Sequence, residues 1–215
     1  MQIITERAAV EITTEAGTAR AELDGDGTPP RFLLALTHGA GGSAGAPDLL
    51  AVRDAALRLG GMVARVTQPY RVRGARAPGS AIRQDAAWIE IVAALRDLAP
   101  GAPLVQGGRS NGARVACRTA AAVGARAVIA LAFPLHPPQR AGGTDAARAT
   151  RVEELRAARA AGVAVLVVNG DRDPFGIPAV GDADRVVIVR GEAHGLKGHR
   201  PEIIGAVTDW LPTVL

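Results

Sequence analysis

The sequence predicts a single α/β domain, spanning residues 1–215, in which helices cover both faces of a mostly parallel sheet. The chain has 215 residues, 48% of them hydrophobic, which is enough for one well-buried domain. Aromatic residues make up only 3%, so the core is expected to consist of Ala, Val, Leu and Ile. From about residue 31, short apolar runs alternate with segments whose apolar residues recur every three to four positions. This alternation predicts parallel strands joined by helices in a three-layer arrangement.

The first elements differ from the rest. Residues 8–23 read as two short strands around a turn at residues 15–17, because apolar and polar residues alternate there. Residues 24–30 are rich in Asp, Gly and Pro and predict a loop. Continuous apolar runs then predict buried strands at residues 32–36, 62–66, 104–105, 128–133, 163–168 and 185–189. Helices are predicted at residues 49–59, 81–98, 111–123, 152–161 and 202–211. Residues 134–150 show no strong period and predict a loop at the carboxyl side of the sheet.

Charge and composition exclude several classes of function. The formal charge is +4, and the arginines are spread along the chain instead of forming the basic stripe of a nucleic-acid binder. The single cysteine, Cys117, rules out an internal disulfide and is expected to be buried. The first residues lack the apolar core of a signal peptide, and no run approaches the ~20 apolar residues of a membrane span. We therefore expect a cytoplasmic protein that binds neither membranes nor nucleic acids.

Residues 108–112, Gly-Arg-Ser-Asn-Gly, match the pattern G-x-S-x-G between a predicted strand and a predicted helix. In a nucleophile elbow the residues flanking the serine must be small, because strand and helix pack closely there. The serine adopts a strained backbone conformation that exposes its Oγ. This context predicts Ser110 as a nucleophile, with a Gly-rich packing turn as the alternative.

A serine nucleophile needs a base and an acid that orients the base. Among the four histidines, His194 follows the last predicted strand, so the order Ser, Asp, His along the chain is kept. Two carboxylates, Asp171 and Asp173, follow the strand at 163–168, and Asp173 is the preferred acid. Asp171 is expected to brace the turn, and Glu192 is a third candidate.

The developing oxyanion of an acyl transfer also needs N–H donors. The backbone N–H of Asn111 is one predicted donor. The second is expected from the glycine-rich loop at residues 37–43, where Ala40 is preferred and Gly41 is the alternative. His38 is expected to hold this loop by hydrogen bonds. The histidines and the cysteine show no metal-ligand spacing, so neither a metal nor another cofactor is expected.

From residues 32 to 211, these motifs resemble the α/β-hydrolase superfamily, in particular its small lidless branch related to dienelactone hydrolases. The segments 37–42, 107–112, 133–138 and 169–174 more closely resemble the hydrolase-like domain shared by a testis-expressed protein and a histone acetyltransferase complex subunit. The resemblance implies an eight-stranded sheet whose second strand is antiparallel, and no lid domain. The resemblance leaves two roles open for the segment at residues 133–138, which contains His136: it lines a pocket or it braces the elbow.

Two functions are compatible with these residues. The first is hydrolysis of a small carboxyl ester or thioester through an acyl-enzyme intermediate on Ser110, helped by Asp173, His194, Ala40 and Asn111. A small-molecule acyl substrate is then the expected partner, and Arg71 or Arg73 are candidates to bind a substrate carboxylate. The second is binding or scaffolding without catalysis, a role that the resemblance to the testis-expressed protein and the acetyltransferase complex subunit implies for some members of that group. The complete set of Ser110, Asp173 and His194 favours the enzyme.

Overall fold

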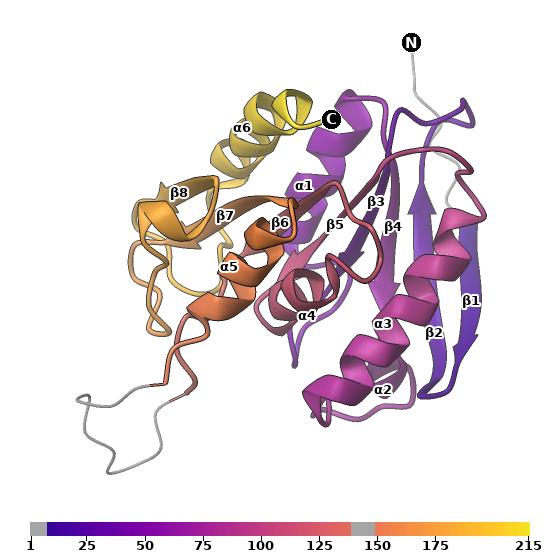
Figure 1. The fold of residues 1–215 in the computed structure, drawn as a ribbon, viewed down its shortest axis with the longest axis horizontal. Coiled ribbons are helices and arrows are strands. Elements are labelled where there is room, and N and C mark those ends of the chain that lie inside the picture. The colour runs from indigo at the N-terminus through magenta and orange to yellow at the C-terminus, as the bar shows by residue number, and fades with distance from the viewer. Residues whose placement is uncertain (1–7, 139–148) are drawn as a thin grey trace.

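The computed structural model describes residues 8–138 and 149–215, and it contains one eight-stranded sheet with the strand order β1-β2-β4-β3-β5-β6-β7-β8 (Figure 1). The strands are β1 (Ala8–Thr14), β2 (Gly17–Asp24), β3 (Leu33–Thr37), β4 (Met62–Thr67), β5 (Leu104–Arg109), β6 (Ala127–Leu131), β7 (Ala164–Gly170) and β8 (Arg185–Val189). Strand β2 runs antiparallel to both β1 and β4, and the other neighbouring pairs are parallel. The predicted mostly parallel sheet, with its antiparallel second strand, is confirmed.

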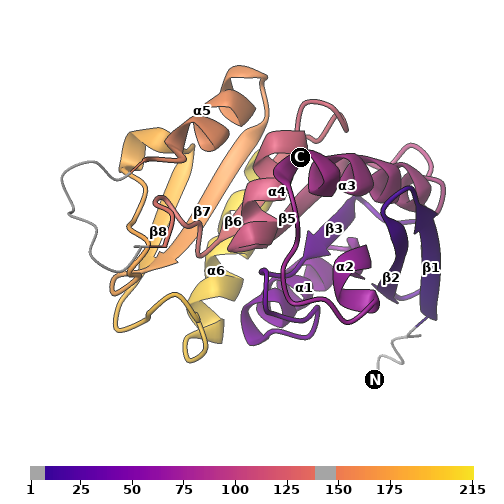
Figure 2. The same cartoon turned by 90° about the horizontal axis from the view of Figure 1, so that it is seen from below.

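Helices cover both faces of the sheet, as predicted (Figure 2). The helices are α1 (Pro47–Arg58), α2 (Pro69–Val72), α3 (Ala81–Arg96), α4 (Asn111–Thr119), α5 (Val152–Ala160) and α6 (Arg200–Trp210). On one face α1 and α6 pack on the sheet through a cluster that includes Leu49, Val52 and Ile203. On the other face α3, α4 and α5 contribute residues such as Trp88, Val115 and Leu155. The sheet therefore has a separate apolar layer on each side, and the fold is a single-domain three-layer α/β fold.

The sheet brings residues distant in the sequence to one edge. Strands β3, β5, β6, β7 and β8 are parallel, so their carboxyl ends all lie at the same side of the sheet. The residues that directly follow β3, β5, β7 and β8 are those predicted to carry the chemistry. In open α/β sheets this edge is where ligands bind.

Several predicted boundaries were displaced. Strand β5 extends to Arg109, four residues beyond the predicted strand, because its glycines continue the buried ladder between β3 and β6. Helix α4 ends at Thr119, short of the predicted residue 123. The short helix α2 was not predicted at all. It starts with Pro69 at its first position, where the missing N–H is not needed.

None of the helices within residues 8–138 and 149–215 is long and apolar enough to cross a membrane.

Candidate active site

The turn between β5 and α4 holds Ser110 in a strained conformation. Its backbone angles are φ 53° and ψ −113°, in a region that residues with a side chain rarely adopt. The flanking glycines make this turn possible. A Cβ on Gly108 would lie 2.6 Å from the carbonyl carbon of Gly112, and a Cβ on Gly112 would lie 2.6 Å from the carbonyl oxygen of Thr37. The strand and helix can approach this closely only with glycine at both positions.

Two hydrogen bonds join the three residues predicted to act together. The Oγ of Ser110 lies 2.9 Å from Nε2 of His194, and Nδ1 of His194 lies 2.8 Å from Oδ2 of Asp173. The carboxylate of Asp173 is buried, whereas the side chain of His194 is 20% exposed. With the proton on Nδ1, the ring donates to Asp173 and its Nε2 accepts the hydroxyl proton of Ser110. This is the geometry that serine activation requires.

The two alternative acids have other contacts. Oδ1 of Asp171 accepts a hydrogen bond of 2.8 Å from the backbone N–H of Gly191, so Asp171 braces the turn after β8. The carboxylate of Glu192 accepts hydrogen bonds from the backbone N–H groups of Lys197 and Gly198, at 3.1 and 2.6 Å. Glu192 therefore stabilises the loop that carries the base.

Two residues near Asp173 were missed in the sequence. The side-chain amide of Asn169 lies 3.4 Å from Oδ2 of Asp173, and its carbonyl oxygen accepts a hydrogen bond from the N–H of Phe133. The ring of Phe175 meets the ring of His194 edge to face, with the centroids 4.5 Å apart. Oδ1 of Asp173 also accepts from the N–H of Phe175, at 2.9 Å. A polar residue at the end of the buried strand β7 was the only available signal for Asn169.

The loop after β3 lies against Ser110. A Cβ on Gly39 would be 3.3 Å from the Cβ of Ser110. The N–H of Gly42 bonds to the carbonyl oxygen of Gly39, at 2.9 Å, so Ala40 and its neighbour are the central residues of a tight turn. The carbonyl oxygen of Ala40 accepts a hydrogen bond from the hydroxyl of Tyr70, at 3.0 Å. Helix α2 therefore fixes the orientation of the loop predicted to bind an oxyanion.

The other predicted donor, Asn111, is the first residue of α4. The first N–H groups of a helix have no acceptor within the helix and carry its positive dipole end. The side-chain amide of Asn111 donates to Oε1 of Gln84 on α3, at 2.6 Å. This contact ties the start of α4 to α3.

His38 holds the glycine-rich loop. Its Nδ1 lies 2.8 Å from the carbonyl oxygen of Gly39, and its Nε2 accepts a hydrogen bond from the N–H of Gln68. The side chain is fully buried, and burial lowers the pKa of His38, with a smaller contribution from the charge of Arg71. A neutral ring, protonated on Nδ1, satisfies both contacts.

The remaining basic candidates have contacts of their own with the backbone. Nδ1 of His136 lies 3.2 Å from the carbonyl oxygen of Ala149, and the backbone N–H of His136 donates to the carbonyl oxygen of Phe175. The segment at residues 133–138 therefore braces the loop after β7, and not the elbow. Arg71 and Arg73 donate to the backbone carbonyls of Ala75 and Ala16 respectively. Cys117 is buried, as predicted.

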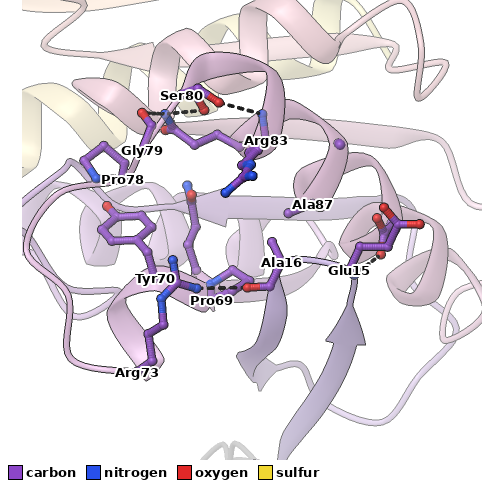
Figure 3. Close-up of a pocket in the computed structure, with 14 residues that line it drawn as sticks. Glu15, Ala16, Pro69, Tyr70, Arg73, Pro78, Gly79, Ser80, Arg83 and Ala87 are labelled. Carbon is purple, nitrogen blue, oxygen red and sulfur yellow. Dashed lines mark hydrogen bonds between the residues drawn. The ribbon is translucent and has the colours of Figure 1, made fainter.

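A cavity of about 870 Å³ lies beside these residues (Figure 3). Figure 3 shows Tyr70 and Pro78 at one end and Glu15 at the other. Its lining includes Tyr70, which contacts the loop at Ala40, and Gln84, which contacts Asn111. Ser110 and His194 do not line it, so the cavity adjoins the hydrogen-bonded residues without containing them.

No group of three His, Cys, Asp or Glu side chains suited to a metal ion occurs in the part of the chain that the structure describes.

Comparisons with known proteins show the family and the fold. Residues 30–187 match the family described as Alpha/beta hydrolase domain. Among curated proteins, no sequence matches. Est1E from Butyrivibrio proteoclasticus, solved with ferulic acid bound, is 16% identical with a TM-score of 0.75, and the alignment covers 95% of this chain and 98% of that one.

Two further solved structures have the same fold. An α/β serine hydrolase without a lid from Xanthomonas campestris is 22% identical with a TM-score of 0.68, covering 97% of this chain and 96% of that one. A dienelactone hydrolase from Anabaena variabilis is 15% identical with a TM-score of 0.74, covering 98% and 99%. The family match spans most of the chain, including Ser110 and Asp173, and the likeness in fold extends over nearly all of it. The chain therefore belongs to the alpha/beta hydrolase domain family.

Proposed function

We propose that the protein is a serine hydrolase that cleaves small carboxyl esters or thioesters through an acyl-enzyme intermediate on Ser110. One observation carries this proposal: Ser110, His194 and Asp173 form a continuous hydrogen-bonded chain, with distances of 2.9 and 2.8 Å. They come from three separate loops, after β5, β8 and β7. A binding protein has no physical need to bring these three side chains together behind a strained serine.

In the proposed first step the Oγ of Ser110 attacks the acyl carbon while Nε2 of His194 accepts the hydroxyl proton. The carbonyl π electrons move to the oxygen, which becomes an oxyanion bound by the N–H groups of Asn111 and Ala40. Asp173 stabilises the imidazolium through the hydrogen bond to Nδ1. The intermediate then collapses: the bond to the alcohol or thiol breaks, and His194 returns the proton to that leaving group.

In the second step water replaces the leaving group. His194 accepts a proton from water, whose oxygen attacks the acyl carbon bound to Ser110. The ester bond to Oγ breaks, the acid is released, and the proton returns to Oγ. No cofactor is needed for this sequence, and the charges balance at each step.

Two features bear on what the protein would bind. The cavity of about 870 Å³ next to the loop at Ala40 offers space for one substituent of the substrate. Several arginines, among them Arg65 and Arg118, are paired with carboxylates of the same chain, which leaves less basic surface for a nucleic acid. A cytoplasmic location and independence from membranes remain part of this proposal.

Hydrolysis of short p-nitrophenyl esters and thioesters tests the proposal. Wild type should turn over, and Ser110→Ala should lose nearly all activity while keeping its circular dichroism spectrum. His194→Ala and Asp173→Asn should lose activity as well. A folded wild-type protein without turnover on any acyl group would favour the scaffold reading, in line with the predicted resemblance to the acetyltransferase complex subunit.

A further inference from the structure

We infer that Arg109 is a positioning residue, together with its counter-ion Asp48. It holds the loop that carries His194 and the glycine-rich loop at residues 37–43 in place beside Ser110. This inference rests on the proposed function, because it assigns a role within the same site. Arg109 is the first variable residue of the G-x-S-x-G pattern, directly before the serine. Nothing in the motif itself requires arginine there.

The guanidinium of Arg109 contacts both loops that must meet at Ser110. One terminal nitrogen donates a hydrogen bond of 2.7 Å to the backbone carbonyl oxygen of His194. The other lies 3.4 Å from where a Cβ on Gly39 would stand, so it packs against the glycine-rich loop. Arg109 directly precedes Ser110 in the chain, so its hydrogen bond to the backbone of His194 links the segment of the nucleophile to the segment of the base.

Asp48 contacts the same guanidinium at a third nitrogen, Nε. Its Oδ2 lies 2.9 Å from Nε of Arg109, and its side chain is fully buried. The N–H is not aimed at the oxygen, so the contact is an ion pair and not a directed hydrogen bond. The other carboxylate oxygen accepts a hydrogen bond from the N–H of Leu49 in the first turn of α1. Helix α1 thereby anchors Arg109.

The charges explain why the carboxylate is buried there despite the cost. Removing a carboxylate from water is unfavourable unless a cation accompanies it. In return, Asp48 neutralises a cation that lies next to a histidine. His194 must itself become cationic during each proton transfer, and an unpaired guanidinium nearby would oppose this by like-charge repulsion. Arg109 can therefore contact both loops while its ion pair with Asp48 keeps the net charge of the two side chains at zero.

A second half-buried arginine provides a matched control. Arg118, on α4, has a side-chain exposure of 16%, close to the 18% of Arg109, and forms an ion pair with Asp85 on α3. It ties α4 to α3 through Asp85 and to α5 through Glu154, and its ion pairs within residues 8–138 and 149–215 involve none of the predicted site residues. Arg118→Ala should lower the melting temperature while keeping turnover per folded molecule.

The test compares Arg109→Ala with Arg118→Ala and wild type, using a p-nitrophenyl ester and a fluorophosphonate. For Arg109→Ala we expect kcat and the labelling rate to fall by about 10- to 100-fold with little change in KM, because misplacement of the reacting groups affects the chemical step. Millimolar guanidinium, well below denaturing concentrations, should restore part of the lost rate in Arg109→Ala only. If Arg109→Ala does not fold, Arg109→Lys replaces it, since lysine keeps the charge but cannot contact Asp48 and the His194 carbonyl together.

A proton NMR measurement separates this inference from the proposed function. The proton between His194 and Asp173 should give a low-field signal in wild type and Arg118→Ala, and this signal should weaken or vanish in Arg109→Ala. This NMR comparison needs no turnover. It therefore still tests the role of Arg109 if the wild-type protein is not labelled and the proposed function is wrong. Unchanged labelling and an unchanged signal in folded Arg109→Ala would overturn the inference. So would equal losses in both variants.

Discussion

Replacing Asp48 by Asn should change how the stability of the protein depends on pH. Burial raises the pKa of Asp48 from 3.8 to about 6, and the nearby charge of Arg109 only partly offsets the effect of burial. Between these two values the folded protein binds a proton that the unfolded chain has already released. The carboxylate therefore makes the folded state less stable as pH rises through this range, and Asn, which is close in shape, does not titrate.

The size of the effect follows from the shift. A pKa change of about 2 corresponds to about 3 kcal/mol, at about 1.4 kcal/mol per unit. The free energy of unfolding of wild type, minus that of Asp48→Asn, should thus fall by about 2–3 kcal/mol from about pH 4 to about pH 7. Above that range the difference should level off, because Asp48 is then ionised in both states.

Urea unfolding at a series of pH values, followed by circular dichroism, measures this difference. Asp97→Asn serves as the control, because it makes the same chemical change on an exposed carboxylate. A difference that stays flat, or that rises with pH, would refute the reasoning. A rise would mean that Arg109 stabilises the carboxylate by more than burial costs.

Three further predictions concern packing and orientation. Gly112→Ala should lower the free energy of unfolding by more than about 2 kcal/mol, since its Cβ would lie 2.6 Å from a backbone carbonyl oxygen of β3. In the control Gly205→Ala the new Cβ meets nothing within 4 Å, so thermal unfolding should show a neutral or stabilising effect. Tyr70→Phe should lower kcat about fivefold at unchanged fold, because the carbonyl of Ala40 loses the hydroxyl donor, and equal rates would contradict this. Burial raises the pKa of Cys117, so a thiol reagent should react with it only after urea unfolding, and rapid reaction of the native protein would show the packing to be wrong.

The sequence was most informative where local pattern and packing agree. Continuous apolar runs predicted the central strands because such strands are covered on both faces. The elbow was predictable because a serine between two glycines, at a strand–helix junction, has few other physical explanations. Ser110, Asp173 and His194 were predicted to act together, and the structure joins them by two hydrogen bonds.

The missed features depend on contacts between segments far apart in the sequence. Arg109 and Asp48 are 61 positions apart, and neither position carries a local signal that they meet. Asn169 was only a polar residue directly after a predicted strand, yet its amide links the strand end to Asp173 and Phe133. The hydroxyl of Tyr70 acts across 30 positions on a backbone carbonyl, which no side-chain pattern can reveal.

Labelling of the intact protein by a fluorophosphonate, read by mass spectrometry, tests the central claim most directly. A serine activated by His194 should take up one probe molecule per chain, and peptide mapping should place the adduct on Ser110. Ser110→Ala should remain unlabelled while showing wild-type thermal unfolding. A folded wild-type protein that stays unlabelled, or one labelled at another residue, would contradict the assignment of Ser110 as the nucleophile.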